Sequence, residues 1–343
     1  MKFTQNFSSL TRFMCFFILL VVVSCSNPLD VDISSSNYQL SSLQLDSILK
    51  NTSGQKLDSE IEKLAQKFPE IIDYQFYYCF KTGLPKDSAF ALNWSEFTQN
   101  SYYKRLSKRI DQKFKSKLPE SKRIIEDGFK RLRVHLLKSK LPKSIIFMNS
   151  YFASSMYCTE NEIGVGLERY LGAKTDVIKE LPGDVFYEWI KEAMEPEYLE
   201  RDAVCAWVLT HICEPGKDFN NIQAMIQWGK ILYLTKAALP EQEEHILLRY
   251  NSADYDWAMR NERDFWEYLV KQNMLFLKSE TDQAAFLQEA PFTAGLPQKG
   301  PDRLGQFLGY RIVCSYMEQY DVTLQELIDK PYNEILTEYQ IND

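Results

Sequence analysis

The sequence predicts a predominantly helical α+β protein with a small sheet. Apolar residues recur at helical spacing along most of the chain, whereas two short runs, Ser144–Asn149 and Glu162–Glu168, have the apolar and alternating character of strands. The 343 residues are 45% hydrophobic and include 21 Phe, 20 Tyr and 6 Trp, with only 13 Gly and 13 Pro. This composition supplies enough apolar area for a large core and excludes a disordered or low-complexity protein.

The N-terminus has the pattern of a targeting segment. Lys2 and Arg12 precede an unbroken apolar run from Phe13 to Val23. Eleven helical residues rise about 16 Å, which is too short to cross a bilayer. We therefore expect residues 1–24 to be a cleaved signal peptide.

The end of this segment, Val22-Val23-Ser24-Cys25, resembles the lipobox of bacterial lipoproteins. The resemblance implies that the thiol of Cys25 is acylated and becomes the first residue; the alternative is an ordinary signal peptide cleaved before a Cys. Two or three acyl chains anchor a protein firmly. No later apolar stretch approaches 18 residues. We expect a membrane-anchored lipoprotein of the cell envelope that faces the periplasm, with the covalent lipid on Cys25 and no other cofactor.

The mature chain begins with residues 25–42, whose Ser and Asn content predicts a short tether to one α-rich domain over residues 43–343. Apolar residues from Leu43 to Lys67 recur at helical spacing, and we expect Pro69 to end this helix. The aromatic run Phe76–Phe80 fits the end of a helix or a strand.

Residues 101–143 contain fifteen Lys or Arg and only four acidic residues. Leu106, Ile110 and Phe114 recur four residues apart, which predicts an amphipathic basic helix or helix pair. Its basic side is either a solvated face or a surface for anionic lipid headgroups or an acidic partner. The candidate contact residues are Lys104, Arg105, Lys108 and Arg109.

Beyond residue 143 two strands precede a helical remainder. The polar Thr159–Asn161 stretch suits a hairpin-like connection between the two strands. Helical patterns punctuated by Pro and Gly then follow. They cover Val185–Ala193, Tyr198–Cys213, Ile222–Leu239, Tyr255–Asn273, Leu304–Tyr320, Leu324–Ile328 and Glu334–Tyr339.

The sequence lacks the residues that several kinds of binding and catalysis require. A net charge of −7 argues against a nucleic-acid partner. No two of the three His lie within 30 residues, so a zinc-binding His-Glu-x-x-His helix is absent, as are Gly-x-Ser-x-Gly and Gly-x-x-x-x-Gly-Lys. Gly164-Val165-Gly166 is a weak glycine pair that more simply allows a close backbone approach or relieves crowding in a strand. We expect no catalytic residue and no metal site.

We expect the other reactive residues to have structural or solvent-exposed positions and no functional role. His211 fits a satisfied or half-exposed position at a helix end. Five mature Cys without metal spacing are expected to be mostly small buried side chains, with one disulfide left open. Six carboxylates surround Pro196, and we expect solvated helix ends rather than a calcium site. They are Glu188, Glu192, Glu195, Glu197, Glu200 and Asp202.

Several stretches, in order, resemble the gliding-motility lipoprotein B (GldB-like) family. They are Ile163–Gly172, Met194–Tyr198, Ile226–Tyr233 leading to Leu239-Pro240, Tyr250 through Asp256-Trp257 and Asn261-Glu262 to Trp266, Ala290–Gly295, Pro301–Gly305 and Gly309–Met317. The resemblance covers residues 145–320 well and the basic segment poorly. It implies a role in gliding motility and type IX secretion, with motility and secretion proteins of the envelope as partners.

The family layout is also similar to that of zinc metallopeptidases. The metal-binding helix of such a peptidase would fall within Tyr198–Val208, which has no His, and its Glu-Gly pair would fall on Trp228-Gly229. An indole offers no lone pair to zinc. The similarity therefore implies a degenerate zincin-like scaffold without the metal, an inference from fold analogy.

Three functions remain open. The first is a non-catalytic, lipid-anchored interaction protein. The second is an envelope binding protein for a peptide, glycan or lipid in a vestigial peptidase cleft. The third is a hydrolase that uses carboxylates or a residual metal site.

We predict that Cys25→Ser prevents acylation, because only the Cys25 thiol can receive the diacylglycerol. Palmitate labelling of the wild-type and variant chains measures this. Equal labelling of both chains would show that the anchor is elsewhere.

Overall fold

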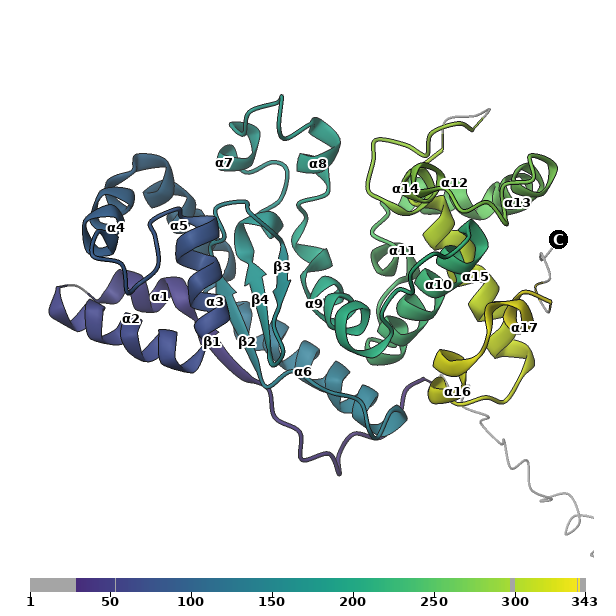
Figure 1. Cartoon of the computed structure of the whole chain (residues 1–343), viewed down its shortest axis with the longest axis horizontal. Coiled ribbons are helices and arrows are strands. Elements are labelled where there is room, and N and C mark those ends of the chain that lie inside the picture. The colour runs from purple at the N-terminus through teal and green to yellow at the C-terminus, as the bar shows by residue number, and fades with distance from the viewer. Residues whose placement is uncertain (1–28, 53, 297–299, 338, 340–343) are drawn as a thin grey trace, which may run out of the picture.

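The computed structural model describes residues 29–52, 54–296, 300–337 and 339. The expected signal peptide, residues 1–24, and Cys25 lie outside the described residues. The described part of the chain is predominantly helical and contains a small sheet (Figure 1), which confirms the α+β class. No helix among the described residues is long and apolar enough to cross a membrane.

The sheet has four strands in the order β1-β2-β4-β3. They are β1 (Ser41–Gln44), β2 (Ser144–Met148), β3 (Met156–Cys158) and β4 (Glu162–Gly166). β1 and β4 both pair parallel with β2, and β3 pairs antiparallel with β4. The two expected strands are confirmed, but the hairpin-like connection between them was wrong. Thr159–Asn161 turns β3 into β4, and the three residues of β3 are too short and too exposed to give a strand pattern.

β2 divides the core because its side chains alternate between the two faces of the sheet. Ile145 and Phe147 belong to the larger hydrophobic cluster, whereas Ile146 and Met148 belong to a smaller one. The strand is buried on both faces, which explains its continuous apolar run.

The smaller cluster is built by the N-terminal helices (Figure 1). Gly54 separates the expected helix into two, and Pro69 follows the second helix but also opens a third, where its missing N–H costs nothing. The aromatic run Phe76–Phe80 lies in and just after a π-helix. The elements are α1 (Leu45–Asn51), α2 (Gln55–Lys67), α3 (Pro69–Asp73), η1 (Tyr74–Cys79) and α4 (Phe90–Gln99).

The basic segment forms the expected helix pair, α5 (Ser101–Phe114) and α6 (Leu118–His135). The expected tether packs against α6. Leu40 is 2% exposed, its N–H donates to Glu126 Oε2 at 2.8 Å, and Tyr38 donates to Pro142 O at 2.6 Å. Tyr38 and Leu40 of the expected tether thus contribute apolar side chains to the core.

The C-terminal half is a helical assembly around α10. The expected helix Tyr255–Asn273 is interrupted at Asn261. The elements are η2 (Leu167–Tyr170), α7 (Asp176–Lys179), α8 (Glu188–Glu192), η3 (Pro196–Tyr198), α9 (Leu199–Trp207), η4 (Val208–Ile212), α10 (Asn221–Ala238), α11 (Glu244–Leu247), α12 (Ser252–Arg260), α13 (Glu262–Lys271), α14 (Glu280–Leu287), α15 (Leu304–Gln319), α16 (Leu324–Asp329) and α17 (Tyr332–Thr337).

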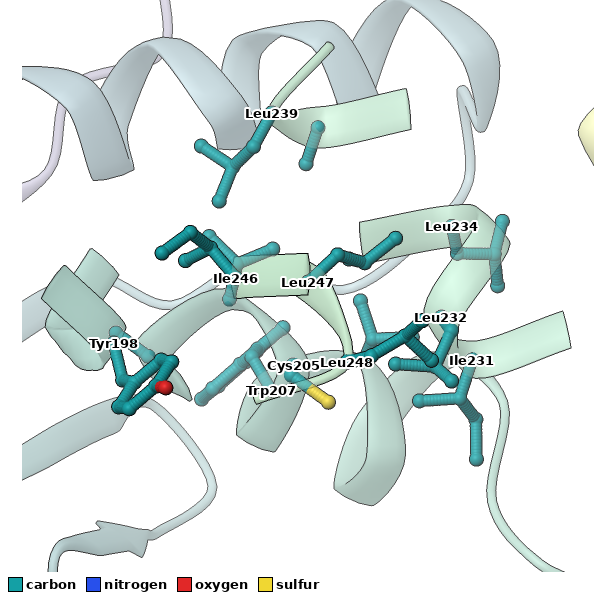
Figure 2. Packing of buried hydrophobic residues seen from close by; sticks show 14 of the residues in the cluster. Tyr198, Cys205, Trp207, Ile231, Leu232, Leu234, Leu239, Ile246, Leu247 and Leu248 are labelled. Atoms are coloured by element: carbon teal, nitrogen blue, oxygen red, sulfur yellow. The ribbon is translucent and has the colours of Figure 1, made fainter. Parts of the chain in front are cut away.

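α10 is buried on nearly every side. Asn220 and Gln223 form a capping box at its start, and Figure 2 shows Leu232 and Leu234 among buried side chains that include Trp207 and Leu247. α15 crosses α10 so closely that a Cβ on Gly309 would lie 1.7 Å from Met225 O. Glycine is required at this crossing.

We predict that Gly309→Ala lowers the free energy of unfolding by about 3 kcal/mol, because the added methyl forces two packed helices apart. Urea unfolding measures the loss. Gly183→Ala is the matched control, since a Cβ at Gly183 meets no atom within 4 Å. Equal stability of the two variants would contradict the close crossing.

Candidate functional site

The four basic residues singled out from the sequence lie on α5: Lys104, Arg105, Lys108 and Arg109. Arg105 pairs with Glu180, and Arg109 donates through Nε and Nη2 to Asp176 at 2.9 and 2.6 Å. The two arginines thus bind the α7 region, while Lys104 and Lys108 are exposed. Their contact with a membrane stays a prediction.

The histidines lie apart. His211 stacks on Trp207 with ring centroids 3.7 Å apart, and His135 Nε2 lies 3.4 Å from Leu29 O. Among the described residues no three His, Cys, Asp or Glu side chains are grouped as a metal site. Cys79, Cys158, Cys205, Cys213 and Cys314 are free thiols, three of them buried and two half-buried.

Polar side chains gather where the three parallel strands end. Asp46 follows β1, Asn149 and Ser150 follow β2, and Glu168 follows β4. The carboxyl ends of parallel strands are a common place for binding sites. Here all four side chains are buried, and Asp46 and Glu168 are 5% and 0% exposed.

Glu168 holds the loop after β2 in an unusual shape. Its carboxylate accepts from the N–H groups of Ser150 and Phe152, at 3.0 and 2.8 Å, and from the Ser150 hydroxyl. Tyr151 and Phe152 are both left-handed, with φ of 53° and 66°. A Cβ on Gly166 would lie 2.2 Å from Ser154 O, which confirms the close backbone approach expected there. Burial raises the pKa of Glu168, and these hydrogen bonds oppose the rise.

Asp46 titrates near neutrality. Burial raises its pKa to about 7, although Lys50 favours the charged form. The nearby carboxylate of Glu168 adds to the rise. A buried carboxylate that ionises near pH 7 makes this end of the sheet sensitive to pH.

The 3-10 turn η2 connects the sheet end to a second charged centre. Tyr170 donates to Asp202 Oδ2 at 2.8 Å. Asp202 also accepts from Arg201 Nη1 at 3.1 Å and from Arg249 Nη1 at 2.5 Å. Asp202 is 5% exposed, so its expected place in a solvated carboxylate cluster was wrong, because distant Tyr170 and Arg249 supply its partners.

Arg249 and a further arginine, Arg303, line a cavity of about 480 Å³, which we call the arginine pocket, and together form its cationic floor. Arg249 lies over the Tyr198 ring at 4.9 Å, and Arg303 binds Asp302 through Nε and Nη2 at 2.9 and 3.0 Å. Both arginines are left-handed, with φ of 55° and 52°. The pocket is lined by Trp189, Glu192, Ala193, Tyr198, Arg249, Asn251, Ala253, Asp254, Trp257, Glu289, Ala290, Pro291, Gly300, Pro301, Asp302 and Arg303.

Glu289 is the loosely held carboxylate of the pocket. Its side chain is 48% exposed, and its Oε1 lies 3.7 Å from Arg249 Nε and 3.9 Å from Arg303 Nη1, beyond hydrogen-bond distance. Burial opposes its ionisation, but four arginines outweigh burial and lower its pKa. They are Arg249, Arg303, Arg201 and Arg169. Arg249 Nε and Arg169 Nε are buried without a hydrogen-bond acceptor among the described residues.

A family model described as gliding motility protein GldB matches residues 26–341. The chain belongs to the GldB gliding-motility family. The resemblance seen in the sequence is thereby confirmed, and membership implies a role in gliding motility and association with the cell envelope. No curated protein and no solved structure matches the chain. Similarity to metallopeptidases stays a prediction.

The stretches that carry the family resemblance converge on the charged centre. Ile163–Gly172 contains Glu168, Arg169 and Tyr170, while several of the other stretches supply Tyr198, the start of α12 and Pro301–Arg303 to the pocket. Sequence reasoning missed these site residues because they come from separate stretches that only the fold brings together. Membership in the family motifs was the available signal for the residues inside the stretches, whereas Arg249 and Glu289 lie just outside them.

We predict that Asp46→Asn stabilises the protein more at pH 8 than at pH 5. The folded pKa of Asp46, about 7, lies above the usual value of 3.8, so the folded state binds the extra proton between these values and loses stability as pH rises toward 7. The increase in the free energy of unfolding caused by the substitution should be on the order of 2 kcal/mol larger at pH 8 than at pH 5.

Urea unfolding of the wild type and the variant at both pH values measures this difference. Asp58→Asn, at an exposed helix position, is the control and should show no such growth. A gain from Asp46→Asn that is the same at both pH values would contradict the raised pKa.

Proposed function

We propose that this protein is a lipid-anchored envelope lipoprotein, facing the periplasm, that supports gliding motility and type IX secretion by binding a partner protein without catalysis. Acylation of Cys25 would supply the anchor. The arginine pocket would receive an acidic segment of the partner.

The observation that carries this proposal is the loose Glu289 carboxylate among four arginines. Asp202 and Asp302 hold Arg249 and Arg303 in fixed positions, so the cationic floor is already organised. The Glu289 carboxylate lies only within 3.7 Å of Arg249 Nε and 3.9 Å of Arg303 Nη1. A carboxylate of a partner can take its place and form shorter, charge-assisted bonds with Arg249 Nε.

The walls of the pocket suit a polypeptide segment. Trp189, Tyr198 and Trp257 offer aromatic surface beside the charged floor, and the volume of about 480 Å³ falls in the range of ligand sites, about 300–1,000 Å³. Aromatic and arginine side chains dominate the energetics of protein interfaces. The pocket therefore suits an anchoring side chain of the partner.

The pocket's groups favour binding over catalysis. The Tyr198 hydroxyl donates to the Tyr250 carbonyl at 3.3 Å rather than to a base, and a nucleophile needs an adjacent base or a lowered pKa. The metal helix implied by the peptidase resemblance coincides with α9, whose first turn carries the Arg201–Asp202 pair. We propose that the pocket is the remnant of a substrate cleft on a degenerate zincin-like scaffold.

We predict that Glu289→Gln strengthens binding of an acidic peptide, because the arginines lose their competing carboxylate. The probe is a pentapeptide of glutamate, with a pentapeptide of glutamine for comparison. Isothermal calorimetry on the full chain should show at least a fivefold lower Kd for the variant with the acidic probe alone. Glu280→Gln, at an exposed position of α14, should match the wild type.

Photo-crosslinking in the native membranes tests the partner directly. A benzophenone amino acid replaces Trp257 at the pocket wall or, as control, Leu92, which is 63% exposed on α4. A protein adduct at position 257 and not at position 92 supports the proposal. Absence of adducts at 257, or hydrolysis of the acidic peptide by the purified chain, would overturn it.

A further inference from the structure

The segment that leads to the proposed anchor is held on the far end of α6. Leu29 O lies 3.4 Å from His135 Nε2, and Asp30 Oδ1 lies 3.5 Å from Arg131 Nε. Figure 1 shows α6 running from beneath the sheet toward the lower right, with the N-terminal segment passing its far end. The first described residue therefore lies beside the C-terminal turn of α6.

The distance from this point to the anchor is short. Leu29 is four positions after Cys25, and an extended chain spans at most about 3.6 Å per residue, so the two Cα atoms lie within about 14 Å. A bilayer that holds acylated Cys25 must then lie close to the end of α6.

This end of α6 is apolar at its tip and basic around it. Leu137 is 76% exposed, the largest exposed fraction among the large hydrophobic side chains that the structure describes, and Val134 is 38% exposed. Arg133 donates through Nη1 to Leu137 O at 3.0 Å and so lies beside the tip. Lys138 and Lys143 are exposed in the following turn and loop, and Lys140, also exposed, pairs with Glu160 at 2.9 Å.

We propose that residues 133–143, the α6 tip, are the surface that contacts the bilayer, with Leu137 and Val134 entering the headgroup layer and the basic residues facing lipid phosphates. This rests on the proposed anchoring through Cys25. Exposed apolar side chains with flanking Lys and Arg are what an anionic membrane interface binds.

The basic face of α5 is less suited than the α6 tip to contact the bilayer. Arg105 and Arg109 there are engaged by Glu180 and Asp176. In Figure 1, α5 lies beside α4 at the upper left, away from the far end of α6. In this view α8 and α12, which contribute residues to the arginine pocket, lie at the top, on the other side of the molecule from the far end of α6.

The test uses the full acylated protein, purified from its own membranes and placed in vesicles of phosphatidylethanolamine and phosphatidylglycerol. A benzophenone amino acid replaces Leu137, Lys108 or, as control, Leu92. After illumination, mass spectrometry measures lipid adducts at each position. We expect at least tenfold more lipid adduct at position 137 than at positions 92 and 108.

Mass spectrometry of the same protease-digested sample also shows whether the peptide that contains Cys25 is acylated. This result separates the two proposals. Acylated Cys25 with adducts mainly at position 108, or at no position, overturns the α6 tip while the anchor stands. Unmodified Cys25 overturns the anchor and, with it, this inference.

Discussion

The buried carboxylate of Asp202 joins parts of the chain that are far apart in sequence. It accepts from Tyr170 just after the sheet, from Arg201 on its own helix and from Arg249 before α12. Removing one partner of a buried ion pair typically costs about 3–5 kcal/mol, because the other charge stays buried alone. The relative positions of the sheet end, α9 and the arginine pocket therefore depend on this one side chain.

The arginine pocket has a fixed cationic floor because of this arrangement around Asp202. Two arginines in left-handed conformations line its floor, and such backbone conformations cost free energy in residues other than glycine. Arg303 Nη2 donates to Arg249 O at 3.0 Å and Tyr250 donates to Asp302 O at 2.5 Å, so the two strained positions support each other. The cationic floor is thus rigid, whereas Glu289 above it is half exposed. Rigid donors beside a displaceable carboxylate are suited to recognition.

The sequence predicted those parts of the fold that local patterns determine. The apolar run of β2, the alternation of β4 and the long apolar helices α10 and α15 were all predicted close to their observed bounds. β1 was missed because its four residues are mostly polar and exposed, and its pairing with β2 depends on residues a hundred positions later. The break at Asn261 was missed because apolar spacing continues across it.

The site was harder to predict than the fold, because burial of a charge depends on partners from other elements. Asp202 looked like one of six solvent-exposed carboxylates around Pro196, and only Arg249 and Tyr170 make it a core residue. Lys104 and Arg105 are adjacent basic residues in the sequence, yet only Arg105 meets an acidic side chain of the α7 region. The family stretches marked the correct neighbourhoods without naming the charged residues in them.

The placement of β1 has a mechanical consequence for an anchored protein. Tension on the N-terminus is first borne by the contacts of residues 29–40 with α6 and then enters the sheet at Ser41, the first residue of an edge strand. Because β1 runs parallel to β2 in register from Ser41–Ser144 to Gln44–Phe147, a pull along the strand axis loads these pairs together in shear instead of peeling them apart one by one. The load then reaches β2, which is buried on both faces, before it reaches any helix that lines the pocket.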